Sequence, residues 1–115
     1  MKQRETEKIT RYADIFAALG AEPRLQIVRL LLTAHPDGMV VNEIQTELQI
    51  TASTLSHHLD KLKNEGLVTV TRESTYLRYR ANAAVLEEVL TFLFAECCSK
   101  KNACVPADQV IKLCK

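Results

Sequence analysis

The chain has 115 residues, which is enough for one domain. Its 47% hydrophobic and 25% charged residues, with three glycines and no tryptophan, favour a soluble helical domain over a sandwich or barrel. The formal net charge of +1 provides no strong global attraction for nucleic acid, although basic residues gathered on one face would still allow binding. No apolar run approaches the ~18 residues of a membrane span, and the charged N-terminal residues do not resemble a signal peptide. We therefore expect a cytoplasmic protein with no membrane partner.

Hydrophobic spacing predicts two helices in the first third of the chain. The first is expected over residues 5–19, before Gly20, with apolar residues at helical spacing: Ile9, Tyr12, Phe16 and Leu19. The second begins near Glu22-Pro23, because proline suits the first helical position, and ends before the turn-forming residues 35–38. Its predicted buried side consists of Leu25, Ile27, Val28, Leu31 and Leu32.

Two further helices are predicted over residues 41–48 and 52–64, separated by a tight turn. Thr51 resembles the N-cap of the longer helix, because its hydroxyl oxygen can accept a backbone N–H of the first turn. This pair of helices forms a helix-turn-helix. The predicted inward side chains of the longer helix are Ala52, Leu55, Leu59 and Leu62.

The apolar period changes after Gly66. Val68 and Val70 alternate with threonines, and residues 76–80 are again rich in strand formers. The polar residues 72–75 between them predict the tip of a hairpin, and a hairpin directly after a helix-turn-helix is a wing. The predicted fold class is therefore mostly α with a small β-hairpin, a winged helix-turn-helix.

The outward face of the helix over residues 52–64 has the chemistry of a DNA-reading surface. Its hydroxyls and imidazole suit base edges or phosphates, and arginines of the wing offer backbone contacts on the same side of the unit. An alternative is that the hydroxyls only cap a solvated helix, and Asp60 would be repelled by phosphate. We interpret His58, at the edge of the core face, as a packed or backbone-bonded histidine. The residues predicted to contact double-stranded DNA are Thr51, Ser53, Thr54, Ser56, His57, Lys61, Arg72, Arg78 and Arg80.

A last helix is predicted over residues 83–97. Seven of the ten residues from 85 to 94 are apolar, a stripe too wide for one buried face. Such a helix favours a position shared between the core and a second copy of the chain. We therefore expect a homodimer formed through the terminal helices.

Three segments resemble the ArsR/SmtB family of winged-helix repressors: FAALGAEPRLQIVRLLL at residues 16–32, ITASTLSHHLDKLKNEGLV at 50–68, and TRESTYLRYR at 71–80. The resemblance implies a homodimer on a palindromic operator, released when a metal or metalloid binds. The chain departs from the family in having Ser74-Thr75 at the wing tip, where Gly-Arg is frequent. Residues 42–48 also lack the Cys-x-Cys pair of many arsenic sensors, and the last helix lacks the Asp/His set of zinc sensors.

All four cysteines lie within the last nineteen residues. Three thiolates without a nearby histidine form a soft site that suits As(III) or Sb(III), whereas zinc normally takes four ligands. The spacing also resembles the C-terminal site of arsenic-responsive relatives, so As(III) is the expected inducer. The predicted ligands are Cys97, Cys98 and Cys104.

Other interpretations of the cysteines stay open. They include structural thiols in a dimer interface, a zinc or cadmium site that adds Cys114, a lead site, and a thiol redox switch. Residues 1–99 are expected to form the DNA-binding and dimerisation domain, and residues 100–115 a tail that contributes ligands. No Gly-rich phosphate loop, nucleophile elbow or His-Glu-x-x-His motif indicates an enzyme.

Overall fold

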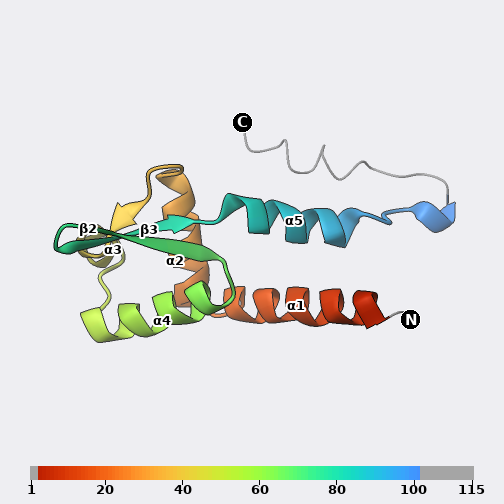
Figure 1. Cartoon of the computed structure of the whole chain (residues 1–115), viewed down its shortest axis with the longest axis horizontal. Coiled ribbons are helices and arrows are strands. Elements are labelled where there is room, and N and C mark those ends of the chain that lie inside the picture. Colours follow the sequence, from red (N-terminus) through yellow and green to blue (C-terminus); the bar gives the residue numbers. More distant parts are fainter. Residues whose placement is uncertain (1–2, 102–115) are drawn as a thin grey trace. The chain divides into compact units, whose positions relative to one another are not determined.

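The computed structural model describes residues 3–101, which fall into two compact units that divide after Asn82. The first unit contains α1 (Gln3–Leu19), α2 (Glu22–Thr33), β1 (Met39–Val40), α3 (Val41–Leu48), α4 (Ala52–Asn64), β2 (Val68–Glu73) and β3 (Tyr76–Ala81). The second contains α5 (Ala83–Phe94) and the 3₁₀ turn η1 (Ser99–Lys101) (Figure 1). Cys104, Cys114 and the rest of the predicted tail lie outside the described residues, and the predicted domain boundary near residue 99 stays a prediction. No described helix is long and apolar enough to span a membrane.

The predicted winged helix-turn-helix is confirmed, and the wing belongs to a larger sheet than expected. β2 and β3 form the hairpin, and β1 adds to the free side of β3, so the antiparallel order is β1-β3-β2. β1 pairs Met39 with Tyr79 and Val40 with Arg78. The sequence did not predict β1, because a strand of two residues has no readable alternation.

α2 is the centre of the first unit, where it contacts α1, α3, α4 and β3 (Figure 1). No polar or charged residue is buried among residues 3–100, for which burial is described. The buried hydrophobic side chains of the helices in this unit are Tyr12, Ile15, Ala18, Ile27, Val28, Leu31, Ile44, Leu55, Leu59 and Leu62.

Several predicted core positions are wrong. α1 buries Tyr12, Ile15 and Ala18, at spacings of three, so two of the apolar residues that indicated its helical period lie on the surface. In α2 the buried side is narrower than predicted, and Ala52 of α4 is exposed. The misplaced large side chains remain 39–46% exposed: Ile9, Phe16, Leu25 and Leu32.

A glycine joins the second helix of the helix-turn-helix to the wing. Gly66 adopts a φ of 76°, its N–H donates to Lys63 O over 2.9 Å, and the N–H of Leu67 donates to Leu62 O over 2.9 Å. These two hydrogen bonds form a Schellman motif, which needs a left-handed residue at this point. Asn82, at the far end of the hairpin, donates its side-chain amide to Gly66 O over 3.0 Å. The two ends of the hairpin are therefore held against the end of α4.

α5 ends at Phe94, three residues before the predicted end, so the prediction that Cys97-Cys98 terminates the helix is wrong. Beyond Phe94 the backbone forms bonds that span three residues, from Cys97 N–H to Phe94 O (2.9 Å) and from Ser99 N–H to Glu96 O (3.1 Å). Cys98 has a φ of 61°, in the left-handed region. The two cysteines therefore lie in turns rather than on a regular helix.

Candidate nucleic-acid interface

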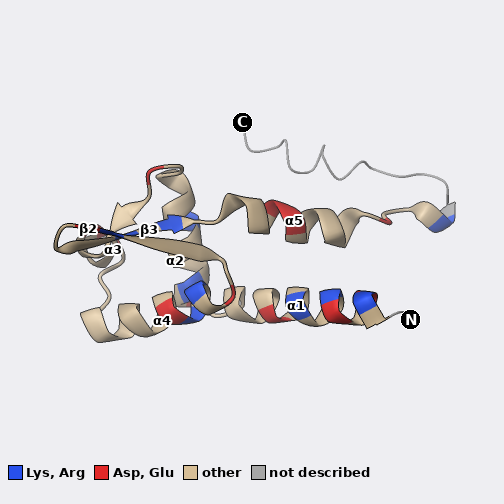
Figure 2. Cartoon of the chain, in the orientation of Figure 1, with Lys and Arg blue, Asp and Glu red and all other residues tan. Residues whose placement is uncertain are grey.

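The N-terminal half of α4 presents small polar side chains without charge. Residues 52–59 contain no Asp, Glu, Lys or Arg, and the charged side chains of α4 begin at Asp60 (Figure 2). All of the predicted DNA-contacting residues on or next to this helix are exposed: Thr51, Ser53, Thr54, Ser56, His57 and Lys61. A helix N-terminus offers unpaired backbone N–H groups, and short hydroxyl side chains allow close approach of a phosphate or base edge.

Thr51 occupies the N-cap position as predicted, but its side chain does not cap the helix. Its hydroxyl donates instead to the hydroxyl of Thr54 over 2.9 Å. The predicted hydrogen bond from a backbone N–H to Thr51 is therefore wrong. Because no side chain caps this end of α4, its first backbone N–H groups face solvent or an incoming ligand.

His58 is half-buried and contacts an arginine rather than the backbone. Arg24 of α2 donates its Nε to Ala18 O of α1 over 2.6 Å, and its Nη1 lies 3.4 Å from Nδ1 of His58. Burial first, then the positive charges of Arg24, His57 and Lys61, hold the pKa of His58 below its usual value. Arg24 therefore connects α1, α2 and α4, a role that no local sequence pattern indicated.

The predicted basic residues of the wing do not share one face. The register pairs Thr71 with Arg78, Thr69 with Arg80 and Arg72 with Leu77. Because side chains alternate along a strand, Arg78 and Arg80 leave one face of the hairpin and Arg72 leaves the other. The prediction that all three arginines lie on the same side is therefore wrong with respect to the two faces of the hairpin.

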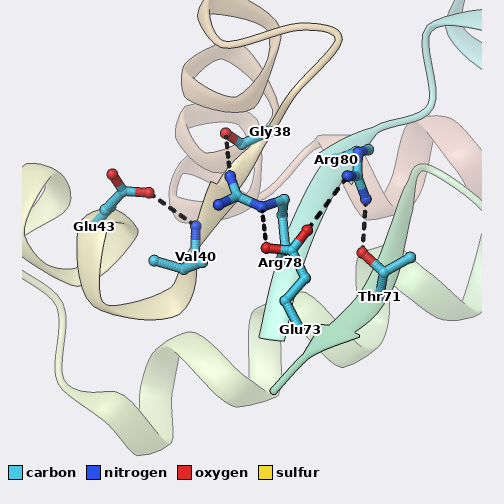
Figure 3. Close-up of polar contacts among 7 residues, drawn as sticks. All are labelled: Gly38, Val40, Glu43, Thr71, Glu73, Arg78 and Arg80. Carbon is cyan, nitrogen blue, oxygen red and sulfur yellow. Dashed lines mark hydrogen bonds and ion pairs between the residues drawn. The ribbon is translucent and has the colours of Figure 1, made fainter. Parts of the chain in front are cut away.

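Arg78 and Arg80 converge on a carboxylate of the opposite strand (Figure 3). Arg78 Nε donates to Glu73 Oε1 over 2.8 Å, and Arg80 Nη2 lies 3.8 Å from Glu73 Oε2. Arg78 Nη1 also donates to Gly38 O over 3.3 Å, and Arg80 Nη1 donates to Thr71 Oγ1 over 2.7 Å. The hydrogen bond to Glu73 is the main reason that the pKa of Arg78 is raised above its usual value. Sequence analysis missed Glu73, although its position between Arg72 and Arg78 was a visible signal.

Cys97 and Cys98 lie close together after α5. Their Sγ atoms are 3.5 Å apart, which is well beyond the ~2.05 Å of a disulfide. Cys97 is half-buried and Cys98 is exposed. Within residues 3–101, no cluster of three potential metal ligands occurs, and the predicted third ligand, Cys104, lies outside that range.

Comparison with known proteins decides the family. A family model described as "Bacterial regulatory protein, arsR family" matches residues 22–70, which run from α2 into β2. An HTH-type transcriptional regulator of Methanocaldococcus jannaschii is 41% identical over 73 residues, covering 64% of this chain and 80% of that protein. The chain belongs to the arsR family. As a member of this family it is a DNA-binding transcriptional regulator rather than an enzyme.

Other relatives support the same assignment of this arsR-family regulator. The transcriptional activator HlyU of Vibrio cholerae is 30% identical over 94 residues, covering 81% of this chain and 84% of HlyU. The homodimeric winged helix-turn-helix DNA-binding domain Mb0332 of Mycobacterium bovis is 30% identical, with a TM-score of 0.65, and the match covers 84% of this chain and 89% of that domain. The family model, which matches residues 22–70, includes all of α4 and the first residues of β2.

Proposed function

We propose that this arsR-family regulator is a homodimeric repressor that occupies a palindromic operator. The N-terminal half of α4 enters the major groove, where its exposed hydroxyls and His57 contact base edges and phosphates. The observation that carries this proposal is the uncapped, uncharged and exposed N-terminal half of α4, in the same compact unit as the basic wing. The wing arginines contact the sugar-phosphate backbone, Arg78 and Arg80 from one face of the hairpin and Arg72 from the other.

Dimerisation through the terminal helices is supported by their exposed apolar side chains. α5 keeps Leu90, Phe92 and Leu93 at 38%, 38% and 59% exposure, and α1 keeps Ile9 and Phe16 at 43% and 40%. Large apolar side chains grouped on short helices favour burial against another chain. The Mycobacterium bovis relative is described as a homodimer, which agrees with this arrangement. Two-fold symmetry then matches the protein to a palindromic site.

The DNA-contacting surface is tested with two single variants and a matched control. His57→Ala and Arg78→Ala should each weaken operator binding, and Arg78→Ala should also lower the slope of log affinity against log salt by about one. Arg29→Ala, which removes an exposed guanidinium of α2, serves as the control for the loss of one positive charge. Operator affinity that is unchanged in both His57→Ala and Arg78→Ala would refute this surface.

The proposed inducer is As(III), or Sb(III), bound by the thiolates of Cys97, Cys98 and Cys104. The contact between Cys97 and Cys98 supports this proposal, because two sulfurs bound to one ion at about 2.3 Å lie about 3.3 Å apart at a right angle and about 3.8 Å apart at a tetrahedral angle. Their observed separation of 3.5 Å is within that range. Their position in turns after α5 leaves the backbone able to adjust around a third ligand.

Release of DNA follows from linkage between the two sites. An ion that prefers the conformation with the three sulfurs together shifts the protein away from its DNA-binding arrangement, and DNA weakens ion binding by the same factor. Couplings of this kind are typically about 1–3 kcal/mol, or 5–150-fold in affinity.

A thiol redox switch is the second candidate function. The Sγ atoms of Cys97 and Cys98 lie 3.5 Å apart, and HlyU of Vibrio cholerae has a solved structure described as the reduced form. Adjacent cysteines have Cα atoms about 3.8 Å apart, which is closer than in ordinary disulfides, so oxidation of this pair would form a strained bond. In this case an oxidant takes two electrons and two protons from a pair of thiols, and a disulfide takes the place of the proposed ion. A divalent soft ion such as Cd(II), Pb(II) or Zn(II) is the alternative inducer of the same thiolates.

Fluorescence anisotropy of a labelled operator duplex distinguishes these candidates. We expect stoichiometric As(III) to release the reduced protein, and the response to be lost in Cys97→Ser and Cys104→Ser but kept in the control Cys114→Ser. Release by Cd(II), Pb(II) or Zn(II) without release by As(III) would replace the metalloid with a divalent ion. Release only by an oxidant, reversed by a dithiol reductant, would establish the redox switch and refute metalloid induction.

A further inference from the structure

The cluster formed by Glu73, Arg78 and Arg80 occupies the most basic face of the wing. Glu73 is the last residue of β2, and both arginines belong to β3. One carboxylate oxygen accepts from Arg78 over 2.8 Å, and the other lies 3.8 Å from Arg80 (Figure 3). The carboxylate therefore faces both guanidinium groups at once.

The antiparallel register brings these three side chains together. Thr71 pairs with Arg78, and Glu73 lies two residues further along β2, on the same face. Arg78 is held from its other side by Gly38 O, and Arg80 by the hydroxyl of Thr71. Each arginine thus has one neutral protein partner and shares the carboxylate of Glu73, so the cluster has a net charge of +1.

The cluster is accessible to a ligand from solution. The side chains of Arg78, Arg80 and Glu73 are 26%, 33% and 46% exposed. An arginine can donate two parallel N–H groups to a phosphate as it does to a carboxylate, so a DNA phosphate and Glu73 compete for the same N–H groups. Exposed ion pairs contribute little to stability, which makes such an exchange feasible.

We propose that Glu73 is an intramolecular competitor of DNA phosphate, which holds Arg78 and Arg80 against the sheet in the free protein and lowers DNA affinity. This inference rests on the proposed contact between the wing and DNA. When DNA binds, a phosphate takes the place of Glu73 on one or both arginines, and the displaced carboxylate turns to solvent. The competition acts on phosphate contacts, which supply non-specific binding, so Glu73 limits binding to DNA of arbitrary sequence.

Glu73→Gln tests this competition because it removes the charge and keeps both the shape of the side chain and a carbonyl acceptor for Arg78. The probe is a short fluorescent duplex of arbitrary sequence, titrated at several salt concentrations. We expect binding several-fold tighter than that of the wild type. The slope of log affinity against log salt should steepen by at most about 0.9, because in the wild type at least one of the two arginines already gains a phosphate when DNA binds.

Two further variants separate competition from a general change of charge. Glu47→Gln makes the same change of net charge on α3, outside the cluster, and should have a much smaller effect on affinity and salt slope. In an Arg78→Ala background, Glu73→Gln should lose a large part of its effect, since the two residues interact directly. Urea unfolding of each variant verifies that the hairpin is intact.

The possible results separate this inference from the proposed DNA surface. Equal effects of Glu73→Gln and Glu47→Gln, or weaker binding by Glu73→Gln with normal stability, would overturn competition by Glu73. If neither the single variant Arg78→Ala nor the single variant Glu73→Gln changes DNA affinity, this face of the wing does not contact DNA. Reduced affinity in Arg78→Ala, with tighter binding in Glu73→Gln, is the result that supports both.

Discussion

Gly38 provides a sharp test of the tertiary structure, because a second glycine with the same backbone conformation serves as its control. Both Gly38 and Gly66 have a φ of 76°, a conformation that L-residues seldom adopt. A Cβ on Gly38 would overlap the carbonyl oxygen of Tyr79 and would lie 2.7 Å from Cγ of Arg80. A Cβ on Gly66 meets nothing within 4 Å. Gly38→Ala and Gly66→Ala therefore have the same backbone strain, and only Gly38→Ala adds a steric overlap.

The expected magnitudes follow from these two terms. Left-handed backbone costs a non-glycine residue about 1–2 kcal/mol, and the reduced entropy of the unfolded chain recovers about 0.4–1 kcal/mol in both variants. The overlap adds about 1–3 kcal/mol for Gly38→Ala, because β1 and β3 must separate around the new methyl group. Gly38→Ala should therefore lower the free energy of unfolding by about 1–3 kcal/mol more than Gly66→Ala.

Urea unfolding followed by far-ultraviolet circular dichroism measures this difference. All samples need the same protomer concentration, because the stability of a dimer depends on concentration. Gly38→Ala should also displace the carbonyl of residue 38, which accepts a hydrogen bond from Arg78. Equal losses of stability in the two alanine variants, within about 0.5 kcal/mol, would refute the close approach of residue 38 to β3.

Three further predictions concern the pH dependence, the core and the end of the wing. The pKa of His58 is lowered in the folded protein, so the unfolded chain binds more protons as the pH drops. The free energy of unfolding should therefore fall below about pH 6.5, as measured by urea unfolding at several pH values. His58→Gln should flatten this part of the profile. Leu59→Ala removes a side chain that is 1% exposed and should cost about 2–5 kcal/mol, whereas the exposed Ser56→Ala should cost less than about 0.5 kcal/mol in the same assay. Asn82→Ala removes an amide donor to the loop after α4 and should cost about 1 kcal/mol; an unchanged unfolding midpoint would show that this hydrogen bond does not stabilise the junction.

Local patterns predicted the order and type of the main elements. The bounds of α3 and α4 match the prediction. α4 lies between Thr51 at its N-cap and Gly66 in the left-handed conformation, whereas α3 begins after Val40 and ends at Gln49, which have no such preference. The change from helical to alternating spacing of apolar residues after Gly66 located the wing. These signals depend on neighbours within a few residues, so the amino-acid sequence alone determines them. The exposed polar face of α4, which is the proposed DNA-reading surface, follows from the same helical period.

Tertiary structure decided which residues meet across the chain. Periodicity placed Phe16 and Leu25 among the apolar residues of their helices, but only packing buried Ile15 of α1 and left Phe16 and Leu25 exposed. The two-residue turn at Ser74-Thr75 extended both strands of the wing and thereby set which face carries each arginine. The contacts of Arg24 with His58, and of Glu73 with Arg78, likewise depend on register and on the approach of separate elements. Their physical basis is non-local, because side chains far apart or on opposite strands become partners only when the backbone has brought them within hydrogen-bond distance.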